Sequence, residues 1–96
     1  MAAYVIFQAD IIDQEQYDRY RAATPATLAA AGGRFIARGG AMTVLEGEAP
    51  AGRMVIVEFP DRKTALNWYH GEEYTAARAL RANAAKTRMY ILDGID

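Results

Sequence analysis

The sequence predicts an α+β fold with the element order β-α-β-β-α-β. Short runs rich in β-branched and aromatic residues occur near both ends and in the middle of the chain, as is typical of strands. The longer segments between these strands have apolar residues at helical spacing. In each of the two helical regions, an aspartate that can cap a helix precedes the first segment. This order is the ferredoxin-like one. We therefore expect a four-stranded antiparallel sheet with its helices on one face.

Composition limits the class of protein. The 96 residues, of which 52% are hydrophobic, fit one domain spanning residues 1–96. The net charge is −1, so charge gives no reason to expect binding to nucleic acid or to an anionic membrane. No apolar run approaches the ~18 residues of a membrane span. Cysteine is absent, which excludes disulfides and thiolate metal sites. We expect a soluble, cytoplasmic protein.

Local patterns predict where each element lies. Strands are expected at residues 2–9, 34–46, 53–59 and 87–93, and helices at residues 13–31, 61–69 and 72–85. Asp13 and Gln16 have the spacing of a capping box at the start of the first helix. Pro25 lacks a backbone N–H, so we expect this helix to kink or restart there.

Two glycine pairs bound the segment GGRFIARGG, residues 32–40. Gly32 lies where a left-handed residue would end the first helix. Gly39 and Gly40 fall inside an extended pattern that resumes after them, and glycine inside a strand usually marks a bulge. We expect a positive φ at Gly39 or Gly40, and a long strand that bends at this pair.

Alternation along the strands predicts two different sheet faces. One face is almost wholly apolar and is expected to carry the helices: Val5, Phe7, Ala9, Met42, Val44, Val55, Val57, Phe59, Met89 and Ile91. The other is mixed but still apolar at its centre: Tyr4, Ile6, Gln8, Thr43, Leu45, Met54, Ile56, Glu58, Arg88, Tyr90 and Leu92. Water is a poor partner for that centre, so we expect a homodimer formed through this face.

Several short motifs resemble a known family. They are the Tyr17 and Tyr20 pair, Arg38-Gly39-Gly40, Glu58-Phe59-Pro60, Trp68-Tyr69, Glu73-Tyr74 and Arg78. Together they resemble the small bacterial family called domain of unknown function 1330. The resemblance implies a ferredoxin-like subunit that pairs face to face as a dimeric α/β barrel, and it implies no established activity. The chain departs from the family pattern at residues 70–72, where Gly71 replaces a residue that would cap the next helix.

Seven residues are candidates for binding a ligand. They are Tyr20, Arg38, Glu58, Trp68, Tyr69, His70 and Arg88. The aromatic members suit either a pocket wall or the core. His70, the only histidine, suits either proton transfer or a solvated helix end. One histidine and scattered carboxylates give no metal-ligand spacing, so no metal and no cofactor are expected.

The polar candidates lead to a specific hypothesis. The first and third strands are expected to be parallel neighbours, so that Gln8, Glu58 and Arg88 lie at one end of the sheet, where Arg38 joins them. We expect Arg38 to turn inward and pair with Glu58. Such a pair either clamps a small acidic molecule or serves as a structural ion pair at the dimer interface.

Two functions are consistent with these patterns. The first is a protein that binds or transforms a small acidic or aromatic molecule in a pocket between sheet and helices. The second is a dimeric binding or stress-related module without a catalytic site. A cavity into which Arg38, Glu58 or Tyr20 converge favours the first, whereas a closed, dry space beneath the helices favours the second.

Overall fold

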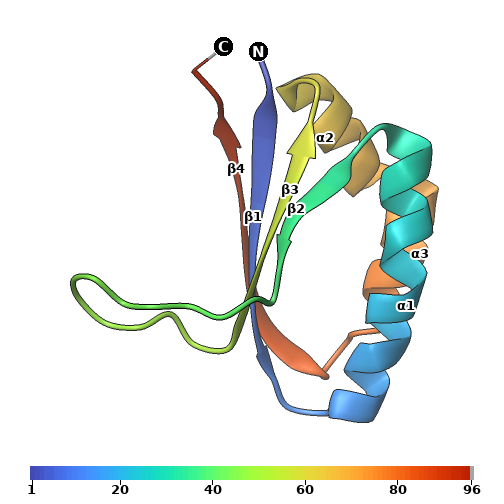
Figure 1. The fold of residues 1–96 in the computed structure, drawn as a ribbon. Coiled ribbons are helices and arrows are strands. Elements are labelled where there is room, and N and C mark those ends of the chain that lie inside the picture. Colours follow the sequence, from blue (N-terminus) through green and yellow to red (C-terminus); the bar gives the residue numbers. More distant parts are fainter. Residues whose placement is uncertain (96) are drawn as a thin grey trace.

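The structure is a computed structural model that describes residues 1–95. In chain order its elements are β1 (Ala3–Ile11), α1 (Gln14–Ala31), β2 (Arg34–Arg38), β3 (Arg53–Phe59), α2 (Arg62–His70), α3 (Glu72–Ala79) and β4 (Ala85–Asp93). The helices cover one face of the sheet and leave the other face open (Figure 1). With α2 and α3 counted as one broken helical segment, the predicted α+β order is confirmed.

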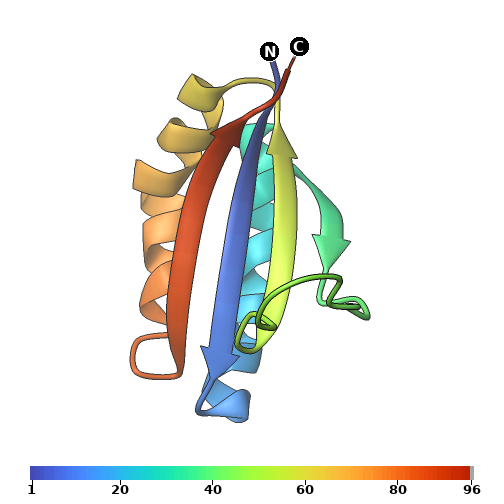
Figure 2. The same cartoon turned by 90° about the vertical axis from the view of Figure 1, so that its left-hand side faces the viewer.

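The sheet has the strand order β2-β3-β1-β4, and all neighbouring strands are antiparallel (Figure 2). The expectation that the first and third strands are parallel was therefore wrong. The crossover through α1 leaves β2 parallel to β1, and the turn into β3 reverses the chain once more. As a result, Gln8 lies opposite Met54, whereas Glu58 lies opposite Tyr4 near the other end of the sheet.

The second strand is shorter than its sequence pattern indicates. It ends at Arg38, and residues 39–52 form a loop that extends away from the helices, beyond the open face of the sheet (Figure 1). We call this segment the 39–52 loop. Its apolar residues alternate like a strand but have no neighbouring strand to pair with, and Leu45 is 90% exposed. Gly39 has φ +68°, as predicted, although it ends the strand rather than bending it.

The first helix is continuous through Pro25, so of the two predicted outcomes, a kink or a restart, the restart does not occur. Asp13 caps it by accepting a hydrogen bond from the Gln16 N–H at 3.1 Å, and Gly32 ends it with φ +86°, both as expected. The Gln16 side chain does not complete a capping box. It donates instead to the carbonyls of Leu80 and Ala82, and so ties α1 to the turn that follows α3.

The third helix ends at Ala79, six residues before its predicted end. A turn with Asn83 at φ +65° follows, and β4 then begins at Ala85. Gly71 gives this helix no side-chain cap, which agrees with the departure of residues 70–72 from the family pattern. The helix therefore begins where it was predicted but ends early, and the chain reaches the sheet sooner than the apolar spacing indicated.

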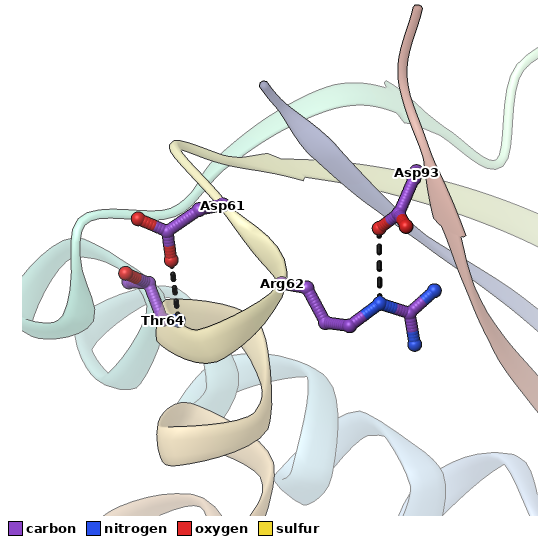
Figure 3. A network of polar contacts seen from close by, with 4 residues as sticks. All are labelled: Asp61, Arg62, Thr64 and Asp93. Carbon is purple, nitrogen blue, oxygen red and sulfur yellow. Dashed lines mark hydrogen bonds and ion pairs between the residues drawn. The ribbon is translucent and has the colours of Figure 1, made fainter.

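Polar contacts hold α2 over the end of the sheet (Figure 3). The Asp61 carboxylate caps α2 by accepting from the Thr64 N–H at 2.7 Å, and hydrogen bonding from the side chain and the backbone of Thr64 lowers the pKa of Asp61. Next to this cap, Arg62 Nε donates to Asp93 Oδ1 of β4 at 3.0 Å. The start of α2 is thus joined to the edge strand β4, and α2 packs across β3, β1 and β4.

The core lies between the helices and the sheet face that the sequence assigned to them. Its strand residues alternate as predicted, except that Met42 and Val44 are exposed in the 39–52 loop. The helices contribute four large rings, of Tyr17, Tyr20, Trp68 and Tyr74. A small chain gains apolar area by burying such rings. They also form one side of the candidate site.

Candidate functional site

A narrow pocket lies between α1 and the sheet. Its lining residues are Phe7, Tyr17, Tyr20, Arg21, Thr24, Leu28, Phe35, Arg38, Arg53, Val55, Val57, Trp68 and Met89. Apolar and aromatic side chains form the walls, and Arg21, Arg38 and Arg53 are the only charged members of this lining. The space open to water-sized molecules is about 30 Å³. That is about the volume of one water molecule in the liquid, so a ligand must move a side chain or extend out of the pocket.

A β-bulge turns Arg38 toward this pocket. Phe35 lies opposite Val57 and Ala37 lies opposite Ile56, so Ile36 is the extra residue of the bulge. Directly opposed residues share a sheet face, and each step along a strand changes the face. The extra residue therefore places Arg38 opposite Val55, on the helix side, instead of on the open face.

The proline in α1 gives Arg38 its hydrogen-bond partner. Pro25 has no N–H, so the carbonyl of Arg21 four residues earlier loses its usual helical donor. Arg38 Nη2 donates to this Arg21 oxygen at 2.9 Å. The Arg38 guanidinium also lies 4.4 Å from the centre of the Phe35 ring, in a cation–π contact. Two sequence features far apart in the chain thus meet at the pocket mouth.

Several polar groups in and next to the pocket are hydrogen-bonded within the protein. The Thr24 hydroxyl donates to the Tyr20 carbonyl and the Thr27 hydroxyl to the Thr24 carbonyl, both at 2.8 Å. Trp68 Nε1 donates to Thr27 Oγ1 at 3.1 Å. Because these donors have partners, the inner pocket presents mainly carbon to a ligand. Its deep end suits an apolar body rather than a polar one.

A chain of hydroxyl contacts runs behind the pocket wall. The hydroxyls of Tyr20 and Tyr74 are 2.7 Å apart, and Arg81 Nη2 lies 3.5 Å from the Tyr74 oxygen. Burial raises the pKa of Tyr74, with Tyr20 adding to the effect, and burial also raises the pKa of Tyr17. These two phenols therefore stay protonated at neutral pH, and they can donate hydrogen bonds but cannot act as general bases.

Of the seven residues predicted from sequence, the structure brings three together at the pocket: Tyr20, Arg38 and Trp68. Tyr69 and His70 lie outside it, at the end of α2, where the Arg78 guanidinium covers the Tyr69 ring at 4.4 Å. Glu58 and Arg88 occupy strand positions on the open face.

The predicted pair of Arg38 with Glu58 was wrong. Glu58 instead accepts from Arg34 Nε at 2.7 Å, and the two residues lie opposite each other on β2 and β3. The alternation of β2 would have placed Arg38 on the same face as Glu58. The bulge at Ile36 reverses that assignment for every residue after it, and so separates the two.

Arg53 and Arg81 contribute to this region but were missed. Arg53 shares strand parity with the core residues Val55 and Val57, so the alternation that identified those two also indicated its direction. Arg81 follows Tyr74 by seven residues and Ala77 by four, which places it on the buried side of a helical pattern.

No cluster of three or more potential metal ligands occurs within residues 1–95. No helix in that part of the chain is long and apolar enough to cross a membrane.

Comparisons with known proteins agree with this fold. The family model described as Domain of unknown function (DUF1330) matches residues 2–95. A comparison with curated proteins gave no match. A crystal structure of a protein of unknown function from Rhodopseudomonas palustris is 16% identical. It covers 99% of this chain and 83% of its own, with a TM-score of 0.74.

Two further structures share this fold. A dimeric ferredoxin-like protein of unknown function from Jannaschia sp. CCS1 is 12% identical, covers 98% of this chain and 100% of its own, and has a TM-score of 0.68. SnoaB, a cofactor-independent oxygenase from Streptomyces nogalater, is 12% identical, covers 99% and 93%, and has a TM-score of 0.61. At such identities the likeness shows a ferredoxin-like fold and does not transfer an activity.

Proposed function

The chain belongs to the DUF1330 family, and we propose that it binds a small acidic molecule with a flat, apolar body in the pocket between α1 and the sheet. The observation that carries this proposal is the composition of the pocket: aromatic and aliphatic walls with arginines as its only charged groups. Ligand sites commonly combine a mostly apolar wall with a few polar groups that fix orientation.

Binding is better supported than catalysis. A general base must reach the reacting proton and must be deprotonated near the working pH. The ionisable groups that line the pocket are tyrosines and arginines, and the only histidine of the chain lies outside it. The criterion that separates the two candidate functions therefore gives a divided result. Arg38 and Tyr20 both line the pocket, as a ligand site requires, but the pocket is narrow and Glu58 does not join them.

The proposed assembly is a homodimer formed through the open face of the sheet. Across β3, β1 and β4 the middle row of this face is Ile56, Ile6 and Tyr90, with Ala37 of β2 beside Ile56. Polar residues take part in the rows on either side of it. An apolar centre with a more polar rim is typical of a protein interface, and a second copy of the same face would cover it. The 39–52 loop projects beyond this face, where it would meet the partner (Figure 1).

The pocket can be tested with its own fluorophore. Trp68 is the only tryptophan of the chain and lines the pocket. Titration with a panel of small aromatic and aliphatic monocarboxylates is expected to change the emission of Trp68 for at least one member, with saturable, one-per-subunit binding. If no member of the panel binds, the proposed function is wrong. If acids bind by calorimetry but leave the emission of Trp68 unchanged, the proposed location is wrong.

A further inference from the structure

The arginines at the pocket mouth have no acidic partner within residues 1–95. The three ion pairs in that part of the chain use Arg19, Arg34 and Arg62, and all lie elsewhere. Arg38 and Arg53 instead share the pocket with each other and with Arg21. Partial loss of hydration, with those two arginines nearby, lowers the pKa of Arg38. A protein of net charge −1 therefore gathers like charges at one place and leaves them unbalanced.

The donors of these arginines are largely unused by the protein. A guanidinium has five N–H donors. Arg38 donates one of them to the Arg21 carbonyl, and the Arg53 side chain donates to no acceptor in residues 1–95. Groups arranged in this way suit an anion, because guanidinium groups bind a carboxylate with short, charge-assisted hydrogen bonds.

Gly39 makes room for one of the two guanidinium groups. Its N–H donates to the Met54 carbonyl at 2.9 Å, which holds it against the start of β3. A Cβ atom at residue 39 would lie 2.7 Å from Arg53 Cζ and 2.9 Å from Arg53 Nη1, closer than real contacts allow. Gly40, by contrast, has open space around it, and its φ is not positive. Gly39 is thus favoured both by its positive φ and by the position of the Arg53 guanidinium, whereas neither reason applies to Gly40.

We propose that Arg38 and Arg53 together hold the acidic group of the ligand, and that Gly39 is a positioning residue that keeps Arg53 aimed at it. The inference rests on the proposed function, because it assumes that the pocket is the binding site. The bulge at Ile36 and the Arg21 carbonyl set Arg38, and the missing side chain at Gly39 sets Arg53. The ligand class is then a monoanion, most simply a carboxylate, whose apolar body points inward.

The test compares sodium benzoate with benzamide, which has nearly the same shape without the charge. In the unaltered protein, benzoate is expected to bind about tenfold to a hundredfold more tightly than benzamide, as charged hydrogen bonds predict. Gly39→Ala is expected to lose about tenfold in benzoate affinity and little in benzamide affinity, and its positive φ also makes this variant less stable. Gly40→Ala, at a position without positive φ, is expected to change neither affinity. Arg53→Met is expected to remove the preference for benzoate.

A second readout works without a ligand and does not depend on how Gly39→Ala folds. If Arg53 serves only an anion, Arg53→Met relieves repulsion from Arg38, and its melting temperature without benzoate is expected to equal or exceed that of the unaltered protein. A structural role predicts a lower melting temperature instead, and that result would overturn the clamp. Equal binding of benzoate and benzamide would overturn the clamp alone. Binding of neither compound would overturn the proposed function and the clamp with it.

Discussion

Replacement of Ile56 by aspartate is expected to convert the protein from a dimer to a monomer, or to prevent its folding. Ile56 lies in the middle row of the open face, directly opposite Ile6. In the proposed dimer its side chain meets the partner's sheet, and an unpaired charge buried there costs several kcal/mol. A loss of about 3 kcal/mol weakens association more than a hundredfold. Light scattering coupled to size-exclusion chromatography measures the particle mass directly.

A matched control is Leu80→Asp. Leu80 is 40% exposed just after α3, on the helix side of the molecule. This change introduces the same charge on an apolar residue away from the open face, so the particle mass is expected to stay that of the dimer. If the unaltered protein runs as a 10.6 kDa particle at micromolar concentration, or if Ile56→Asp leaves a stable dimer, the open face is not the interface.

Trp68→Ala is expected to lower the free energy of unfolding by about 3–5 kcal/mol. Trp68 is 6% exposed, and its ring centre lies 4.0 Å from that of Tyr74 and 5.3 Å from that of Phe59. Truncation removes this packing and opens a void beside the pocket. It also leaves Thr27 Oγ1 without the donor it now has. Urea unfolding followed by circular dichroism measures the change.

The conservative variant Trp68→Phe separates packing from hydrogen bonding. It keeps much of the ring contact but cannot donate to Thr27, so a loss of about 1–2 kcal/mol is expected. If Trp68→Ala were as stable as Trp68→Phe, ring packing would contribute little to the free energy of unfolding, and this account of the aromatic core would be wrong.

Much of the fold could be predicted from the sequence because local signals agreed with the tertiary structure. The alternation of residues 53–59 coincides with a strand that is paired on both sides, and Asp13 and Asp61 cap helices as their spacing indicated. The expectation failed where a pattern lacked a partner. Residues 41–46 alternate like a strand, but no strand lies beside them, and β-propensity reflects fit to a neighbour more than a backbone preference.

The site was harder to predict for a related reason. The location of a bulge depends on the partner strand, and one extra residue at Ile36 decides whether Arg38 meets Glu58 or the pocket. Similarly, Pro25 indicates a missing helical hydrogen bond, but nothing local shows that Arg38 supplies a donor to the Arg21 carbonyl. Tyr20 and Trp68 were identifiable because buried aromatic residues on a helix serve a core and a pocket wall equally well.

Native mass spectrometry of freshly purified protein tests the central claim that the pocket holds a small acid. The account predicts one bound small acidic molecule per subunit, either carried from the cell or taken up from added benzoate, and it predicts that Arg53→Met no longer retains it. A subunit mass that is unchanged by every monocarboxylate offered, in the unaltered protein as in Arg53→Met, would contradict the account.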